Sequence, residues 1–373
     1  MKGMPPNHVR VLHVAATCGH GGVETLLATL VRCQQTQGIQ ADVFFLRDCG
    51  GAQRFEGLCR PRFGDWGVLA GVLKAGDCNV VHAATYTASD LARSLEASKY
   101  PGAVVLTSHE CQVYPHDLHY DCVTAVSAAV ARSIQGYYSL RVQVIHNGVD
   151  IDRFAPGSVP YDGKPIMAWI GRADDPMKDF SAFLALANRP VSDRFRVIVV
   201  DGSAEDKSNT EWLPTDCEVR RRVPWQQMPE FYRLIRGSGG LLISTSKEEP
   251  FGLNVLEAMA CGCPVVAPAS GGIPEFVRHK ETGYLYDRVD GIDAMEAGIA
   301  WIYAGDNYLE VSQSAATYVV LSHSAERMCS EYSDVYERAL ALRAKTKPRS
   351  KTAGARHAWG GMKFLSGKGR HSD

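Results

Sequence analysis

The chain has 373 residues, 45% of them apolar, and its 40 basic side chains nearly balance its 41 acidic ones. This length suits two domains, the apolar share excludes wholesale disorder, and the charge balance gives no global attraction to nucleic acid or anionic membranes. No apolar stretch reaches the ~18 residues of a membrane span, and the brief apolar run after Arg10, which His13 interrupts, is not expected to be a signal peptide. Eleven cysteines without a pairing rhythm favour reduced thiols and a cytoplasmic location.

In the first part of the chain, short apolar runs alternate with amphipathic stretches, which is typical of a parallel sheet flanked by helices. The predicted strands cover residues 9–15, 42–46, 80–83, 104–107, 123–126 and 142–145. The predicted helices cover residues 24–37, 89–98 and 127–135. Residues 1–148 are therefore expected to form one doubly wound α/β lobe.

A linker rich in proline and glycine follows over residues 156–165, and a second α/β series then begins. Its predicted strands are 166–170, 196–200, 218–223, 241–244 and 265–267, and its helices are 179–188 and 250–260. Residues 292–343 are helical by pattern. A second lobe is expected over residues 149–324, followed by a helix at 325–342 and a basic, disordered tail at 343–373, where nine Lys and Arg residues face one acid. Ligands of such lobes bind at the carboxyl ends of the strands.

The stretch 246–276 is the most informative. Pro250 suits the first position of a helix, because its missing N–H costs nothing there. The amides that follow would then lie in the first turn and form an anion site together with the helix dipole. They belong to Phe251, Gly252, Leu253 and Asn254.

Glu249 and Glu257 bracket this turn. In a continuous helix, eight residues place them about 12 Å apart along the axis, which is too far for a hydrolytic acid/base pair at roughly 5–9.5 Å. The spacing favours the two ends of one extended ligand with a diphosphate between them. The alternative is an amphipathic helix with two solvated acids.

Two cations accompany the first strand of the second lobe. Arg172 follows the strand 166–170 directly, and Lys178 precedes the next helix. Both could neutralise phosphate at the edge of the sheet. Alternatively, Asp174 and Asp175, which lie between them, could pair with both.

Gly19–Gly22 forms a glycine loop after the first strand. Glu24 stands where a dinucleotide fingerprint needs its last glycine, although Asp48 could act as the ribose-binding acid, so an NAD(P)-dependent oxidoreductase stays open as an alternative. Otherwise the loop, with Gly21 and Gly22, is a flexible backbone cradle.

His109 follows a strand of the first lobe directly and is a candidate because strand ends line the ligand site. His82 is a weaker candidate of the same kind. Asp150 and Asp152 form a D-x-D pattern in the connection between the lobes, where a metal site is the less favoured interpretation.

The order of these motifs resembles that of the retaining GT-B glycosyltransferases of family 4. The resemblance extends to about Tyr286, and the block E-P-F-G-x4-E-A-M-A that begins at Glu249 is highly specific. It implies two Rossmann-like lobes, a nucleotide-sugar donor held mainly by the second lobe, and no metal or other cofactor.

The resemblance also implies roles for individual residues. Glu257 would bind the ribose hydroxyls, Glu249 the donor sugar, and Arg172 with Lys178 the diphosphate. His109 would lie near the reacting sugar, and the Gly21–Gly22 loop would close over the phosphates. Base contacts are expected near Val223, and the helix at 325–342 would return to the first lobe.

We therefore expect a hexosyltransferase that uses an NDP-sugar, a UDP-sugar by preference, and an acceptor hydroxyl, with retention at the anomeric carbon. The alternatives are a nucleotide-sugar epimerase or hydrolase of the same fold, the oxidoreductase, and a non-catalytic binding relative. No nucleic-acid partner is expected. The basic tail could make weak peripheral contact with anionic lipid.

Overall fold

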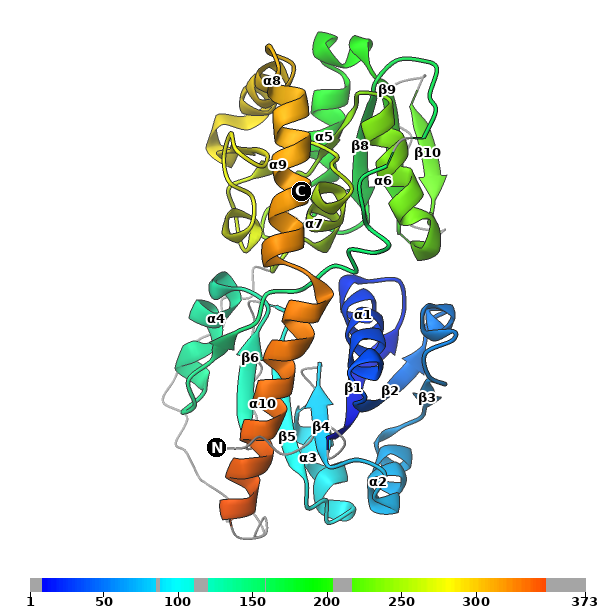
Figure 1. Ribbon diagram of the computed structural model, residues 1–373, viewed down its shortest axis with the longest axis vertical. Coiled ribbons are helices and arrows are strands. Elements are labelled where there is room, and N and C mark those ends of the chain that lie inside the picture. Colours follow the sequence, from blue (N-terminus) through cyan, green and yellow to red (C-terminus); the bar gives the residue numbers. More distant parts are fainter. Residues whose placement is uncertain (1–8, 85–87, 111–119, 158, 204–216, 347–373) are drawn as a thin grey trace, which may run out of the picture.

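Two α/β lobes stack along the long axis of the molecule in the computed structural model, which describes residues 9–84, 88–110, 120–157, 159–203 and 217–346 (Figure 1). Each lobe contains one sheet of parallel strands with helices on both sides. The predicted α/β fold class with two Rossmann-like lobes is confirmed.

The sheet of the first lobe has the strand order β3-β2-β1-β4-β5-β6-β7. Its strands are β1 Arg10–Cys18, β2 Gln40–Asp48, β3 Arg62–Phe63, β4 Val80–Ala83, β5 Ala103–Ser108, β6 Cys122–Ala125 and β7 Gln143–Val144. Its helices are α1 Gly22–Thr36, α2 Trp66–Ala75, α3 Ala88–Ala97 and α4 Ala128–Ile134, and a short 3₁₀ helix, η2, covers Ala52–Phe55. The order reverses between β1 and β4, so the ends of these two strands form the switch point where ligands of such sheets bind.

Alternating side chains of β5 show how this sheet is covered. Val104 and Leu106 belong to an apolar cluster with α2 and α3 on one face, whereas Val105 packs with α1 and α10 on the other. Helix α10, Ala325–Lys345, comes from the far end of the chain and lies along the first lobe (Figure 1).

The sheet of the second lobe has the order β10-β9-β8-β11-β12-β13, with its switch point between β8 and β11. Its strands are β8 Ile166–Gly171, β9 Arg196–Asp201, β10 Glu218–Arg221, β11 Leu241–Ile243, β12 Val265–Pro268 and β13 Tyr284–Tyr286. Its helices are α5 Phe180–Ala187, α6 Met228–Gly237, α7 Leu253–Ala260, α8 Gly291–Ile302 and α9 Asn307–Ser322. Short 3₁₀ helices η5, Trp225–Gln227, and η6, Ile273–Glu275, lie in its loops.

The two connections between the lobes run side by side. Val149 N–H donates to His323 O (2.9 Å), and Ala325 N–H donates to Val149 O (2.8 Å). A Cβ at Gly148 would lie 2.4 Å from Ser324 O, so glycine is required for this approach. The chain thus crosses between the lobes in both directions at one place.

Several elements were not predicted. β3 and β13 have two and three residues, too few for an alternation pattern, and helices α2 and α6 were also missed. Within the part of the chain that the structure describes, no helix has the length and apolar character needed to cross a membrane. The predicted tail lies outside the described residues from residue 347 onward.

Candidate active site

The glycine loop of the first lobe is held in shape by a buried carboxylate. Glu24 lies in the first turn of α1 and turns back, so that Gly19 N–H donates to its Oε1 (2.8 Å) and Thr17 Oγ1 donates to the same oxygen (3.3 Å). The loop faces the second lobe, because a Cβ on Gly22 would be 3.7 Å from Leu253 Cδ1. The switch-point loop of one lobe therefore meets the start of α7 in the other.

The predicted start of the α7 helix is wrong. The helix begins at Leu253 and not at Pro250, because Gly252 adopts φ 104° and interrupts the helical path. The 12 Å spacing expected for Glu249 and Glu257 therefore does not apply, since it assumed one continuous helix. The anion site narrows to the amides of Leu253 and Asn254, which no carbonyl of the helix can reach.

Other contacts fix this helix start. Asn254 Nδ2 donates to Ile170 O (3.0 Å) near the end of β8, and its Oδ1 accepts from Val255 N–H (3.0 Å). Phe251 is a core residue, since it is buried with its ring 5.0 Å from that of Phe276. The Asn254 and Phe251 side chains thus position the turn, and the free donors there are backbone groups.

Lys178 and Glu249, 71 residues apart, form an ion pair at the switch point of the second lobe. Lys178 Nζ donates to Glu249 Oε2 (2.5 Å), and Ser246 Oγ donates to the same oxygen (3.0 Å). The loops that carry them are also joined, because Thr245 Oγ1 donates to Lys178 O (2.8 Å) and Lys247 N–H donates to Met177 O (2.7 Å).

Arg172, the other predicted phosphate ligand, does not pair with Glu249 as Lys178 does. Its side chain is 61% exposed and pairs with Asp175, as the alternative interpretation of this loop expected. Burial raises the pKa of Asp175, but hydrogen bonds from Arg172 and Met177 N–H outweigh it and bring the pKa below its usual value. Of the two predicted phosphate ligands, only Lys178 pairs with a motif glutamate.

Glu257 is buried, with 6% of its surface exposed, and accepts a hydrogen bond from Tyr232 Oη (3.2 Å). Burial raises its pKa to about 7, against the opposing effects of Tyr232, Arg54 and Arg153. A carboxyl group that titrates near neutral pH in a buried position is typical of a functional site.

His109 follows β5 directly, and its buried Nε2 has no hydrogen-bond partner among the described residues. Burial lowers its pKa to about 4, so the ring is neutral at pH 7. His82, in contrast, lies within β4, where Thr107 Oγ1 (2.6 Å) and Tyr336 Oη (2.8 Å) contact its two nitrogens. The weaker candidate is thus a core residue.

The remaining candidates have structural contacts or lie apart. Val223 is half-buried and lines a cavity of about 370 Å³ together with Arg222, whose φ is 53°. Asp150 Oδ2 lies 3.7 Å from Arg32 Nε, and no group of three or more potential metal ligands occurs among the described residues. Asp48 Oδ1 accepts from Gly50 N–H (2.9 Å).

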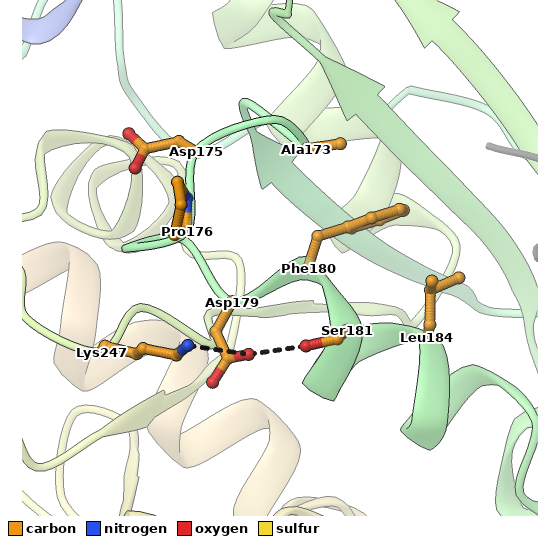
Figure 2. A pocket seen from close by; sticks show the side chains of 8 residues that line it. All are labelled: Ala173, Asp175, Pro176, Asp179, Phe180, Ser181, Leu184 and Lys247. Carbon is orange, nitrogen blue, oxygen red and sulfur yellow. Dashed lines mark hydrogen bonds and ion pairs between the residues drawn. The ribbon is translucent and has the colours of Figure 1, made fainter. Parts of the chain in front are cut away.

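A second cavity, of about 300 Å³, flanks the loop between β8 and α5 (Figure 2). Asp179 lies at its edge and contacts Lys247 Nζ (3.9 Å) and Ser181 Oγ (2.8 Å). Neither Lys178 nor Glu249 lines this cavity, so it lies beside the motif residues and does not include them.

Sequence reasoning missed the residues around Glu257. Arg54 and Arg153 come from two separate segments and Trp225 and Tyr232 from the continuous stretch of η5 and α6, and none of the four belongs to a motif that we recognised. The only signal was the position of Trp225, two residues after Val223, where base contacts were expected.

Comparisons with known proteins agree with this architecture. Residues 150–318 match the family model described as Glycosyl transferases group 1, and residues 20–153 match that of Glycosyltransferase Family 4. A D-inositol 3-phosphate glycosyltransferase from Mycobacterium sp. (strain KMS) is 32% identical over 200 residues, which are 50% of this chain and 43% of that protein. An N-acetyl-alpha-D-glucosaminyl L-malate synthase from Bacillus anthracis is 33% identical over 96 residues, 26% of this chain and 25% of that protein. The chain thus spans less than half the length of these relatives.

Solved structures share the fold. A glycosyltransferase from Rickettsia africae superposes with a TM-score of 0.73 at 17% identity, covering 90% of this chain and 99% of the other. HepE from Anabaena, solved in complex with UDP-glucose, has a TM-score of 0.73 at 19% identity and covers 88% of this chain and 99% of its own.

Proposed function

Because the chain belongs to the GT-B glycosyltransferases of group 1, we propose that it transfers a hexose from an NDP-sugar to an acceptor hydroxyl, with retention of the anomeric configuration and without a metal ion. A UDP-sugar is the first candidate donor, since HepE was solved with UDP-glucose. Two relatives are named for D-inositol 3-phosphate and L-malate, so small anionic molecules are the first acceptors to test.

One observation carries this proposal: the switch-point loops of the two lobes meet. Gly22 of the first lobe faces Leu253 at the start of α7, and the Lys178–Glu249 pair follows the switch-point strands β8 and β11 of the same second lobe. A diphosphate between them would meet the free amides of the helix start and the glycine-loop backbone. A nucleotide-sugar held there would lie among these charged groups and backbone donors.

We assign the roles accordingly. Lys178, Arg172 and the amides of Leu253 and Asn254 would stabilise the negative charge that grows on the departing diphosphate. Glu249 would bind hydroxyls of the sugar and is oriented by Lys178.

Three further contacts complete the proposed donor site. Glu257 would accept the ribose hydroxyls, and Val223 would contact the base through its backbone. His109, neutral at pH 7, would lie beside the sugar. These roles follow the family pattern, and His109 and Val223 also lie just beyond the ends of strands β5 and β10.

The proposed step breaks the bond between the anomeric carbon and the diphosphate oxygen and forms a bond to the acceptor oxygen on the same face of the sugar. The acceptor proton passes to the leaving phosphate. The protein supplies electrostatic stabilisation, of which one donor or cation contributes about 3–4 kcal/mol.

A thermal-shift screen with UDP-, GDP-, ADP- and dTDP-sugars tests the donor assignment. A ligand at a hundred times its Kd adds about 2.7 kcal/mol of apparent stability, so one nucleotide series should stand out. NMR of the product formed with EDTA present then reports the anomeric configuration and the need for metal. Change of the donor without acceptor would instead identify an epimerase or hydrolase, and oxidation of reduced nicotinamide would identify an oxidoreductase.

Two finer proposals rest on the sequence. We place the protein in the cytoplasm because its cysteines show no pairing rhythm, and those that the structure describes are free thiols. We also propose weak contact of residues 343–373 with anionic lipid. Equal pelleting with anionic liposomes, with and without these residues, would contradict that contact.

A further inference from the structure

Arg54 is a buried cation that the proposed reaction does not use. It lies in η2 after β2 of the first lobe, and only 8% of its surface is exposed. Its Nη1 donates to Gly21 O (3.0 Å) in the glycine loop and to Thr25 Oγ1 (2.8 Å) in α1. Both acceptors are uncharged, so these hydrogen bonds alone do not neutralise a guanidinium that has left water.

The charges that balance Arg54 come from both lobes. Glu24 of the first lobe and Glu257 of the second both favour its charged form, against the burial that lowers its pKa. The guanidinium also lies 5.8 Å from the ring centroid of Trp225 in the second lobe, and Arg153 lies 3.7 Å from the same ring. Two guanidiniums thus lie against one buried indole, and Glu257 interacts with the same side chain.

This arrangement is complete only when the lobes are together. Arg54 and Glu24 belong to the first lobe, whereas Glu257 and Trp225 belong to the second. Separation of the lobes would leave Glu257 without the cation from the first lobe. The same separation would withdraw the glycine loop from the start of α7, because Arg54 is bonded to Gly21.

We propose that Arg54 is a positioning residue for the donor, which joins the glycine loop of the first lobe to the ribose-binding carboxylate Glu257 of the second. It rests on the proposed function, since it assigns the ribose to Glu257. Arg54 engages the Gly21 carbonyl and Glu24 engages Gly19 N–H, which leaves the N–H groups of Gly21 and Gly22 as the donors that the loop would offer to a diphosphate. It also makes the affinity for the nucleotide depend on the closed arrangement of the lobes.

The proposal has a consequence for pH. A carboxylate accepts hydrogen bonds from two ribose hydroxyls, whereas a protonated carboxyl group loses part of this capacity. Glu257 has a raised pKa of about 7, so nucleotide binding should weaken as the pH falls through 7. The groups that interact with Glu257 are Tyr232, Trp225, Arg54, Arg153 and Cys261. Arg54 is the one that comes from the first lobe.

The test uses the full-length protein with Arg54→Met, which keeps the length of the side chain and removes its charge. Arg60→Met, at an exposed arginine of the same lobe, is the matched control. Calorimetry measures the Kd for the nucleoside diphosphate that the wild type binds, and kinetics give KM and kcat for its sugar, between pH 5.5 and 9. We expect the donor KM and the Kd to rise at least about tenfold for Arg54→Met, with kcat at saturating donor changed far less.

The pH profile separates this role from a structural one. At low pH, donor binding weakens as Glu257 is protonated, and we call this part of the pH profile the acidic limb. In Arg54→Met the acidic limb should move to higher pH, because the variant lacks a cation that favours ionised Glu257. Arg54→Lys should restore the limb in part. In a Glu257→Gln background, Arg54→Met should shift no limb. An unchanged Kd and limb, or a tenfold loss that persists unchanged in the Glu257→Gln background, would overturn the proposal.

Two controls keep the outcomes distinct. If the wild type binds no nucleotide in the same calorimeter, the proposed function fails and not the role of Arg54 alone. If Arg54→Met does not fold, as judged by its unfolding transition, Arg54→Lys carries the test, because it keeps the charge and loses the planar fork. Wild-type affinity and an unshifted limb in Arg54→Lys would then contradict the need for the guanidinium at this place.

Discussion

The two lobes share one topology but fill their sheets differently. The second lobe packs aromatic rings against its strands: Trp169 lies with its ring centroid 4.7 Å from that of Phe180 and 6.1 Å from that of Phe183. The first lobe buries a polar network beneath α10. The network comprises His13, Gln34, His82, Thr107, Thr124, Tyr332 and Tyr336.

A single order of protons satisfies the part of this network near β5. Thr124 Oγ1 donates to Leu106 O (3.2 Å), so it accepts from Thr107 (2.7 Å). The Thr107 oxygen then accepts from His82 Nε2 (2.6 Å) and from Tyr332 Oη (3.1 Å). His82 therefore carries its proton on Nε2.

The same order continues through α10 to β1. A neutral His82 leaves Nδ1 to accept from Tyr336 Oη (2.8 Å), and Tyr336 accepts from Gln34 Nε2 (3.3 Å). Gln34 Oε1 then accepts from His13 Nε2 (2.9 Å). Burial lowers the pKa of His13 to about 4 and that of His82 well below its usual value, so both rings are neutral as this order requires.

The two lobes therefore differ in the interactions that cover their sheets. Hydrogen bonds of the network fix α10, which comes from 21 residues at the end of the described chain, in one register on the first lobe. The sheet of the second lobe is instead covered by apolar and aromatic side chains. Buried hydrogen bonds thus contribute to the assembly of the first lobe, and aromatic packing to that of the second.

Lys178→Ala should have the largest effect, since it removes a cation from the proposed leaving-group site. We expect kcat to fall by a factor of about 100 to 1,000, which corresponds to about 3–4 kcal/mol for such a group, with little change in folding. Initial rates at saturating donor measure it. Lys247→Ala is the matched control, because Lys247 lies on the neighbouring loop and contacts Asp179. Near-normal turnover in Lys178→Ala would refute the phosphate role.

Glu257→Gln should separate function from stability in the second lobe. The pKa of Glu257 is raised from 4.5 to about 7, so the folded state binds a proton more tightly than the unfolded chain, and stability is lost as the pH rises through this window. At pH 8 the variant should therefore be more stable by about 3 kcal/mol in the absence of ligand, yet bind nucleotide weakly. Denaturant titrations at pH 4 and pH 8 measure the gain. An equal effect at both pH values would show that the carboxylate is not strained by burial.

His13→Gln should reveal the opposite pH dependence in the first lobe. The pKa of His13 is lowered from 6.5 to about 4, so its contribution is complete above pH 6.5 and is lost as the pH falls toward 4. Between pH 6.5 and pH 4, the free energy of unfolding of the wild type should fall by up to about 3 kcal/mol because of this one group, and that of the variant should fall less. Unfolding curves between pH 4 and 7 test this. Exposed His279→Gln is the control, and identical slopes for His13→Gln and wild type would contradict the assignment.

Periodicity predicted the architecture well because the buried strands are apolar over several residues and the helices between them are amphipathic. The strands that begin the switch points, β1 and β8, were predicted to start within one residue of where the structure places them. The predicted helix start at Pro250 was wrong, because the sequence does not show that Gly252 adopts a left-handed conformation.

The site was predictable only where a motif carries it. Lys178 and Glu249 each belong to a recognisable segment, but their contact joins residues that are 71 positions apart and depends on how β8 and β11 neighbour each other. Arg54 belongs to no motif, and its relation to Glu257 arises only from the approach of the two lobes. A contact between lobes joins two distant segments, and neither segment carries a sequence pattern that reveals it.

Glu275→Gln should have the smallest effect and tests how firmly the lobes are joined. Glu275 lies in η6 of the second lobe, and its carboxylate accepts from the N–H groups of Ala128 (2.8 Å) and Ala129 (2.9 Å) at the start of α4 and from His146 Nε2 (2.8 Å). Burial alone would raise its pKa, but these bonds bring it below the usual value, so the contact persists at neutral pH. Loss of the charge should lower the free energy of unfolding by about 1–2 kcal/mol, the usual size of a helix-capping interaction.

Calorimetric unfolding shows whether the contacts of Glu275 couple the unfolding of the two lobes. If Glu275 couples the lobes, Glu275→Gln should broaden the unfolding transition toward two steps, with the acid-sensitive first lobe moving to lower temperature. The exposed Glu281, paired with Arg278 at 2.9 Å in the same lobe, provides the control as Glu281→Gln. A single transition, as sharp as that of wild type, would mean that the apolar cluster spanning both lobes, which includes Val149 and Phe251, already couples them without the carboxylate.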